Sequence, residues 1–257
     1  MADSPNDRIA WITGASSGIG KALALRMARD GWRVAITARS ASTLAEVAAE
    51  AQSLDGSLLP CPADVTDRAG MADILRRIEG ELGPVNLAVL NAGSHREVAA
   101  ASFDADDFRA LMELNFLGTV NGIEALLPGM LARGSGRIAI VASVAGYTGL
   151  PTAAAYGASK AALINMAEAL QPELAAAGVT LQIVNPGFIR TPLTDRNSFP
   201  MPFLMEPDAA ADAFWRGLQS DRFEIVFPRR LAWLLKALKL LPYPLYFGIT
   251  RRMLRDS

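Results

Sequence analysis

A glycine-rich turn near the amino terminus constrains this chain more than any other feature. The turn joins a short apolar run, Ile9–Thr13, to a helical pattern over Lys21–Asp30, and it reads Thr13-Gly14-Ala15-Ser16-Ser17-Gly18-Ile19-Gly20. A short apolar run that ends at a glycine is typical of a buried parallel strand. The chain therefore begins with a strand, a glycine-rich turn and a helix, in that order.

The three glycines of this turn have separate uses. Gly14 permits the tight turn, Gly18 lets the backbone approach a pyrophosphate, and Gly20 allows the helix to pack closely on the strand. The start of the helix offers free N–H groups and a partial positive charge to phosphates. The spacing is Gly-x-x-x-Gly-x-Gly rather than the more common Gly-x-Gly-x-x-Gly. We expect a dinucleotide site here rather than an ordinary flexible turn.

The rest of the chain continues the alternation of strands and helices. Further apolar runs are Val34–Ala38, Ser57–Ala63, Val85–Leu90, Gly136–Ala142, Val179–Val184 and Phe223–Phe227. Helical patterns cover Thr43–Gln52, Arg68–Leu82, Asp107–Leu127 and Tyr156–Ala177, and Pro172 predicts a kink or an early break in the last of them. This alternation predicts an α/β fold: a single Rossmann-type doubly wound domain, with a seven-stranded parallel sheet, helices on both faces and a helical C-terminal extension.

Length and charge limit the class of protein further. A chain of 257 residues fits one domain, 1–257, with a core of about 8–228 and an extension, 229–257. The formal net charge of −1 argues against a dedicated nucleic-acid binder. The extension departs from this balance, because it holds one acidic residue, Asp256, against seven basic ones: Arg229, Arg230, Lys236, Lys239, Arg251, Arg252 and Arg255.

The chain has one cysteine and one histidine, which excludes other kinds of site. Cys61 cannot form an internal disulfide, and its apolar surroundings predict a buried core thiol. The single His95 argues against a His-dependent triad or a His-rich zinc site, and we expect no metal. Its loop position favours a solvated side chain over one that lines a pocket. The first residues, Met1–Arg8, lack the apolar stretch of a signal peptide, so we expect a cytoplasmic protein.

A series of motifs in the right order resembles the short-chain dehydrogenase/reductase family. After the glycine-rich turn come Asn91-Ala92-Gly93, Asn115, Ser143, the Tyr-x-x-x-Lys pair of Tyr156 and Lys160, and Pro186-Gly187. The resemblance covers about residues 8–228. It implies an NAD(P)-dependent oxidoreductase, and a homodimer or homotetramer built on the helices over Asp107–Leu127 and Tyr156–Ala177.

The resemblance also implies the cofactor contacts. They are Gly14, Ser16, Ser17, Gly18, Ile19, Gly20, Arg39, Asp64, Val65, Asn91, Ala92, Gly93, Tyr156, Lys160, Pro186, Gly187, Ile189 and Thr191. No acidic residue follows the second strand to bind a ribose 2′-hydroxyl, whereas Arg39 suits a 2′-phosphate. We therefore favour NADP(H) over NAD(H). The alternatives are that Arg39 is a solvated charge that stacks on adenine, and that Asp64 only caps a turn or helix.

Tyr156 and Lys160 are four residues apart on a predicted helix and share one of its faces. A neighbouring ammonium group lowers the pKa of a phenol, which is otherwise about 10. The resemblance implies that Tyr156 is the general acid in reduction and the base in oxidation, while Lys160 also holds the nicotinamide ribose. It further implies that Ser143 polarises the carbonyl and that Asn115 positions a water in the proton relay.

Two apolar segments remain. The stretch 193–205 matches the family's mobile lid and contains Phe199, Met201, Phe203, Leu204 and Met205, which favours an apolar substrate unless these side chains only pack on the sheet. The extension carries leucines at helical spacing before Pro242 and Pro244, and is too interrupted to span a bilayer. Its composition suits an interfacial helix on anionic lipid, with packing on its own domain or on a second subunit as the alternative. No family residue carries over onto it.

Together these features predict an NADP(H)-dependent oxidoreductase that interconverts a carbonyl and a secondary alcohol on an apolar small molecule. The alternatives are the same chemistry with NAD(H), and a catalytically silent dinucleotide-binding sensor or membrane-docked scaffold. We expect a cytoplasmic protein with a peripheral membrane contact through 229–257 as a further option.

Overall fold

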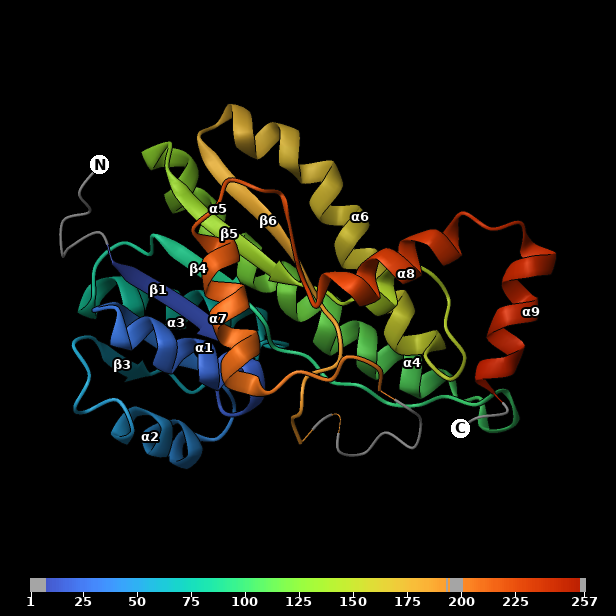
Figure 1. Ribbon diagram of the computed structural model, residues 1–257. Coiled ribbons are helices and arrows are strands. Elements are labelled where there is room, and N and C mark those ends of the chain that lie inside the picture. The colour runs from blue at the N-terminus through green and yellow to red at the C-terminus, as the bar shows by residue number, and fades with distance from the viewer. Residues whose placement is uncertain (1–7, 193, 195–200, 255–257) are drawn as a thin grey trace.

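A seven-stranded parallel sheet forms the centre of the computed structural model, which describes residues 8–192, 194 and 201–254 (Figure 1). Its strands are β1 (Ile9–Thr13), β2 (Arg33–Thr37), β3 (Ser57–Pro60), β4 (Leu87–Leu90), β5 (Gly136–Val141), β6 (Val179–Pro186) and β7 (Glu224–Phe227). Their order is β3-β2-β1-β4-β5-β6-β7, so the predicted fold class is confirmed. The direction of strand addition reverses between β1 and β4, and open α/β sheets bind ligands at such a point.

Helices cover both faces of this sheet. One face carries α1 (Gly18–Arg29), α2 (Ala41–Ala49) and α7 (Pro207–Leu218). The other face carries α3 (Arg68–Glu81), α5 (Gly118–Arg133) and α6 (Ala154–Ala176). Cys61 lies fully buried in this second core, as predicted, and burial raises the pKa of its thiol to about 11. The sheet is thus buried on both sides, and its strand ends are the parts left for binding.

The helix predicted over Asp107–Leu127 is instead divided, which corrects the sequence analysis. A helix α4 (Ala105–Leu111) leads into a π-helical turn η3 (Met112–Leu117), and α5 follows. A Cβ on Gly118 would lie only 2.7 Å from Cγ2 of Val65, so α5 approaches the sheet side closely. The wider π turn carries Asn115 into the interior, where it is 0% exposed. Regular helical periodicity gave no sign of this irregularity.

Of the kink or early break expected at Pro172, the early break is wrong, because the helix continues past this residue. α6 runs from Ala154 through Pro172 to Ala176. Leu163 and Leu174, on either side of the proline, are both buried against the sheet. This packing holds the two parts of the helix in place although the proline cannot donate a backbone hydrogen bond.

The extension forms two helices, α8 (Arg229–Lys239) and α9 (Tyr243–Met253). Leu231, Leu235 and Leu238 on α8 are buried and pack against Val144 and Tyr147. The prolines separate the helices as expected, since Pro242 caps α9 and Pro244 lies in its first turn, where proline is tolerated. The alternative that the extension packs on its own domain is therefore correct for one face of α8.

The half-buried carboxylate of Glu224 attaches α8 to the sheet. Tyr147 Oη donates to Glu224 Oε1 over 2.5 Å, Asn185 Nδ2 donates to the same oxygen over 3.0 Å, and Lys236 donates to Oε2. Burial alone would raise the pKa of Glu224, but the hydrogen bonds from Lys236, Tyr147 and Asn185 outweigh it and hold that pKa below its ordinary value. The ionised carboxylate therefore stabilises the folded state.

We expect Glu224→Gln to lower the free energy of unfolding by about 1–3 kcal/mol at neutral pH, because it removes charge-assisted hydrogen bonds. The folded-state pKa is depressed, so the stabilisation is complete above the unfolded-state pKa and is lost as the pH falls through the folded value. Urea unfolding at neutral and acidic pH should show the difference from wild type shrinking below about pH 4. Glu168→Gln, on the exposed side of α6, is the control and should change stability by less than about 0.5 kcal/mol. Equal stability of Glu224→Gln and wild type at neutral pH would contradict the expectation.

Candidate active site

The glycine-rich turn joins β1 to α1 at the carboxyl edge of the sheet. Gly14 and Gly18 adopt φ values of 67° and 56°, which favour glycine. A Cβ on Gly14 would lie 2.7 Å from Cα of Ala92, so the turn touches the segment after β4. The first turn of α1 contains no acidic residue, and Ser17 makes no side-chain capping hydrogen bond. The N–H groups at this helix start therefore have no side-chain acceptor of their own, which suits an anion.

Thr13 and Asn91 fasten the ends of β1 and β4 together. The Thr13 hydroxyl accepts from the backbone N–H groups of Asn91 and Ala92, over 2.9 and 3.1 Å. In return Asn91 Nδ2 donates to the carbonyl oxygens of Thr13 and Gly14, over 3.0 and 3.1 Å. The amide group of Asn91 therefore holds the glycine-rich turn in shape. The Thr13 hydroxyl also holds the two turns together, a role that motif matching did not assign to it.

Asn115 organises the segment that follows β4. Its Oδ1 accepts from the backbone of Ser94 over 2.8 Å, and its Nδ2 donates to the Ser94 carbonyl and to Ser159 Oγ, both over 3.0 Å. Ser159 Oγ donates to the backbone carbonyl of Tyr156 over 2.7 Å. Ser94 and Ser159 were not identified from the sequence. Ser159 was detectable, because it lies one helical turn after Tyr156 on the same predicted face.

Tyr156, Lys160 and Ser143 come together at the start of α6 and the end of β5. Lys160 is 4% exposed, its Nζ donates to the carbonyl of Val141 over 2.9 Å, and it lies 5.8 Å from the centroid of the Tyr156 ring. Ser143 Oγ accepts from the backbone of Ala145 over 3.1 Å and lies within hydrogen-bonding distance of the Pro186 carbonyl, at 3.4 Å. A Cβ on Gly93 would lie 3.3 Å from Lys160 Nζ, so the predicted Asn-Ala-Gly turn borders the ammonium group.

Burial shifts both titratable groups of this cluster toward their neutral forms. It raises the pKa of Tyr156, although a hydrogen bond from the Ser143 side chain acts in the other direction. It lowers the pKa of Lys160 to about 8. An anion bound near Lys160 would favour its charged form again. In this structure the Tyr156 hydroxyl is therefore protonated at neutral pH and available as a proton donor.

His95 is not the solvated loop side chain that the sequence favoured. Its ring lies edge-on to Tyr156, with centroids 4.8 Å apart, and both ring nitrogens are buried without a hydrogen-bond partner in the described part of the chain. Burial lowers its pKa, although the charge of Glu97 opposes this shift. The imidazole borders the tyrosine in a segment whose Val98 pairs with Thr152 and Ala153, just before α6, a tertiary contact that a single histidine in a loop does not reveal.

The residues expected at the adenine end lie apart from the cluster of Tyr156, Lys160 and Ser143, after β2 and β3. Arg39 is exposed and makes no ion pair within the described residues. Asp64 Oδ1 accepts from the backbone of Thr66 over 3.0 Å; this bond and, more weakly, the charge of Arg39 lower the pKa of Asp64. The observed hydrogen bonds of Asp64 are therefore those of a residue that caps a turn. Val65 is 6% exposed and packs against Gly118.

The segment after β6 returns to the glycine-rich turn. Gly187 donates its N–H to the Phe227 carbonyl over 2.8 Å, which fixes the chain after Pro186. A Cβ on Gly18 would lie 3.1 Å from Cγ2 of Thr191, and Ile189 is buried and pairs with Met205. Of the turn's remaining predicted residues, Ser16 and Ile19 are half-buried and Ser17 is exposed. Residues 193 and 195–200 of the expected lid, including Phe199, lie outside the described residues.

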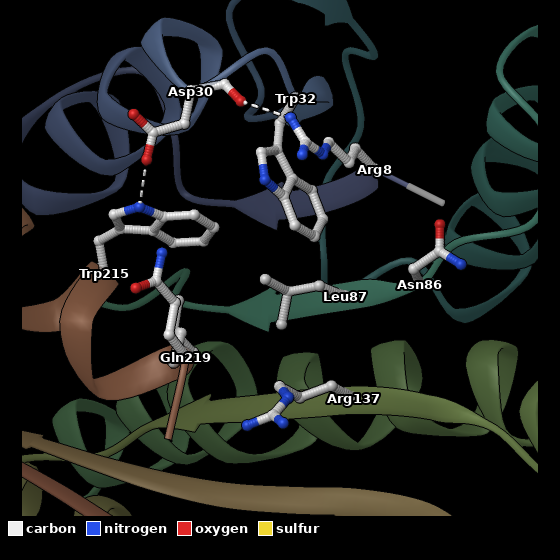
Figure 2. Close-up of a pocket in the computed structure, with 9 residues that line it drawn as sticks. Arg8, Asp30, Trp32, Asn86, Leu87, Arg137, Trp215 and Gln219 are labelled. Atoms are coloured by element: carbon white, nitrogen blue, oxygen red, sulfur yellow. Dashed lines mark hydrogen bonds between the residues drawn. The ribbon is translucent and has the colours of Figure 1, made fainter. Parts of the chain in front are cut away.

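A separate cavity of about 680 Å³ lies at the opposite, amino-terminal edge of the sheet (Figure 2). Arg8, Trp32, Leu87 and Arg137 line it, together with Trp215 from α7. Its polar groups bond mainly to one another or to nearby backbone, as in the bond from Trp215 Nε1 to Asp30 Oδ2 over 2.6 Å. None of the predicted site residues lines it.

Comparison with known proteins gives consistent matches. A family model described as short chain dehydrogenase matches residues 8–200. An uncharacterized oxidoreductase of Myxococcus xanthus is 37% identical over 246 residues, which are 96% of this chain and 97% of the relative. A 3-oxoacyl-acyl-carrier-protein reductase of Thermotoga maritima is 34% identical over 189 residues, 74% of this chain and 77% of that protein. The crystal structure of a short-chain type dehydrogenase/reductase from Mycobacterium marinum matches with a TM-score of 0.78 at 31% identity, covering 85% of this chain and 93% of the other.

We expect Thr13→Val to lower the free energy of unfolding by about 2–4 kcal/mol, because it leaves the N–H groups of Asn91 and Ala92 without their acceptor. Thr13→Ser keeps the hydroxyl and should lose about 1 kcal/mol or less. Urea unfolding of both variants beside wild type measures the difference. Equal stability of the two variants would show that the Thr13 hydroxyl does not hold the ends of β1 and β4 together.

Proposed function

Because the chain belongs to the short-chain dehydrogenase/reductase family and is an oxidoreductase of that family, we propose that it interconverts a carbonyl and a secondary alcohol on an apolar small molecule, with NADP(H) as its cofactor. Members of this family use NAD(H) or NADP(H), and the dinucleotide supplies or accepts the hydride when bound. The residues present fit such a group. Gly14 and Gly18 carry no side chain at two positions of the turn where the backbone has a positive φ, and the start of α1 has no acidic residue that would repel phosphate.

The burial of Lys160 beside Tyr156 is the observation that carries the proposal. Most lysines are exposed, whereas Lys160 is almost fully buried. Its ammonium group donates to one backbone carbonyl, that of Val141, and lies beside the Tyr156 ring. Perturbed titratable groups of this kind concentrate at functional sites. In the proposed reaction Tyr156 is the general acid in reduction and the base in oxidation, Ser143 holds the substrate oxygen, and Lys160 binds the nicotinamide ribose.

The protonated form of Tyr156 suits the role of proton donor in the reductive direction. Since burial raises the pKa of Tyr156, its hydroxyl carries a proton that can pass to the developing alkoxide of a carbonyl substrate. Asn115 positions a water that returns a proton to this site, while its side chain also holds the backbone of Ser94 in place. The apolar residues in the described part of the expected lid, Phe203, Leu204 and Met205, support an apolar substrate.

Arg39 supports NADP(H) over NAD(H). It stands directly after β2 with no ion-pair partner among the described residues, so its guanidinium group can make charge-assisted hydrogen bonds to a 2′-phosphate. The remaining predicted contacts are proposed to hold the dinucleotide between its adenine end and its nicotinamide end. They are the glycine-rich turn, Asn91-Ala92-Gly93, Pro186-Gly187, Ile189 and Thr191. A catalytically silent sensor or scaffold is disfavoured, because the matched relatives are oxidoreductases and the Asn115, Ser143, Tyr156 and Lys160 set is complete.

The proposed partners follow from the same family. Its members are typically oligomeric, and we propose a homodimer or homotetramer that uses α4, η3, α5 and α6, where Leu117 of η3 and Leu131 of α5 are exposed. We also propose that the enzyme is cytoplasmic and that its extension, 229–257, is the part that contacts a membrane.

We expect Tyr156→Phe to reduce turnover by about 10²–10⁴-fold, because the variant lacks the proton donor. NADPH binding, followed by fluorescence titration, should be unchanged, since the ring and Lys160 remain. The assay is reduction of a panel of apolar ketones, followed by the absorbance of the reduced nicotinamide. Tyr243→Phe, at an exposed tyrosine of α9, is the matched control and should keep wild-type turnover. Undiminished turnover in Tyr156→Phe would refute the mechanism.

We expect Arg39→Ala to weaken NADPH binding by about tenfold or more and to leave NADH binding unchanged, because only NADPH carries the 2′-phosphate. Arg33→Ala, at the other end of β2, is the control. Thermal shifts with each dinucleotide report the affinities, since a ligand of the native state raises its stability. Equal loss for NADH and NADPH in Arg39→Ala would show that Arg39 only stacks on adenine.

A further inference from the structure

Exposed apolar side chains concentrate on the two helices of the extension. Among the described residues, nine large apolar side chains of 229–254 are more than 40% exposed: Trp233, Leu234, Leu240, Tyr243, Leu245, Phe247, Ile249, Met253 and Leu254. Leu240, between the two helices, is 85% exposed. In α9 only Tyr246 and Thr250 are buried. A helix this apolar around most of its circumference is normally covered by something.

The charged residues of the same surface all have one sign. Arg229, Arg230, Lys239, Arg251 and Arg252 are exposed, and no acidic residue occurs within 229–254. None of these five cations forms an ion pair with another described residue, whereas Lys236 is bound to Glu224. The surface therefore combines aromatic and aliphatic side chains with a set of unneutralised cations.

The position of the helices leaves this surface accessible. α8 and α9 lie at one end of the molecule, and α9 projects away from the sheet (Figure 1). On α8 the exposed Arg230, Trp233 and Leu234 alternate with the buried Leu231 and Leu235, so one helix packs inward and presents an apolar, basic stripe outward. No helix of residues 8–192, 194 and 201–254 is long and apolar enough to cross a bilayer.

We propose that the outer surface of α8 and α9 docks on an anionic phospholipid bilayer and lies in its interface. Aromatic and leucine side chains enter the boundary between headgroups and acyl chains, while cationic side chains bind the anionic headgroups. A second copy of this chain fits the surface less well. A twofold contact would bring the same five cations against each other without an acidic group to neutralise them.

Docking would bring the bilayer to the wall of the catalytic site. The Tyr246 hydroxyl of α9 donates to the carbonyl of Gly149, and Thr148 Oγ1 donates to Tyr246 Oη over 3.1 Å. Residues 148 and 149 lie in the loop that begins at Ser143, so the helix that meets the lipid also fixes that loop. Resting on the proposed function, this geometry implies that the apolar carbonyl substrate is taken from the bilayer.

Vesicle cosedimentation of the full chain tests the docking without any turnover. We expect partition into vesicles of phosphatidylcholine with phosphatidylglycerol, and far less into phosphatidylcholine alone. The double variant Arg251→Gln/Arg252→Gln should weaken binding to the anionic vesicles about thirtyfold, since each basic side chain near the surface contributes roughly fivefold. Trp233→Ser should weaken it about tenfold. Both changes are at exposed positions, and NADPH binding checks that each variant is folded.

The matched control is Arg29→Gln/Arg216→Gln, which removes two exposed cations from α1 and α7 and should keep binding within about twofold. The proposal is overturned if wild type does not bind anionic vesicles, or if the extension variant binds as the control does. It is also overturned if sedimentation equilibrium shows Trp233→Ser converting an oligomer to a monomer, because a second copy would then cover the surface.

The source of the substrate has its own test. An apolar ketone held in anionic vesicles should be reduced at least about fivefold faster by wild type than by Arg251→Gln/Arg252→Gln, and at equal rates by both proteins when vesicles are omitted. Equal rates in both formats would contradict uptake from the bilayer. If wild type reduces no ketone in either format, the proposed function fails, while vesicle binding still decides the docking.

Discussion

The clamp between Thr13 and Asn91 begins where the backbone ladder of β1 and β4 ends. The two strands are paired from Ala10 with Leu87 to Ile12 with Val89, and beyond this point side chains continue the pairing. Because one hydroxyl accepts two N–H groups and one amide donates to two carbonyls, the turn before α1 and the turn after β4 are held at a fixed separation. The proposed dinucleotide site is built on these two turns.

The second constraint is the buried ammonium of Lys160. A buried charge is costly unless it is paired, and here one carbonyl, that of Val141, is the hydrogen-bond acceptor. Burial accordingly moves the pKa of Lys160 down to about 8 and that of Tyr156 up. A negatively charged ligand next to Lys160 would recover the lost stabilisation. The cost of burying Lys160 with a single hydrogen-bond acceptor is consistent with a site that is completed when a ligand binds.

The sequence predicted the strands, their parallel arrangement and most of the helices, because apolar runs and glycine turns are local signals. It could not predict the π turn at Asn115, because the apolar periodicity there is that of a regular helix. The contact of His95 with Tyr156 and the uninterrupted helix at Pro172 also arise from tertiary packing. The proposed roles of Tyr156, Lys160, Ser143 and Asn115 came from motif resemblance. The structure adds Ser94 and Ser159 as hydrogen-bond partners of Asn115, and the Thr13 hydroxyl as the partner of Asn91 and Ala92.

The extension is joined to the catalytic domain by polar contacts as well as by apolar packing. Glu224 binds Tyr147 and Lys236, and Tyr246 binds Gly149, so both helices hold the segment that begins at Ser143. The same α8 whose leucines fill this cluster exposes Trp233 and Leu234 on its outer side. A change in what covers the outer side would therefore act on the loop through packed and hydrogen-bonded groups. The proposed substrate access and the proposed surface binding would therefore depend on one structural unit rather than on an appended tail.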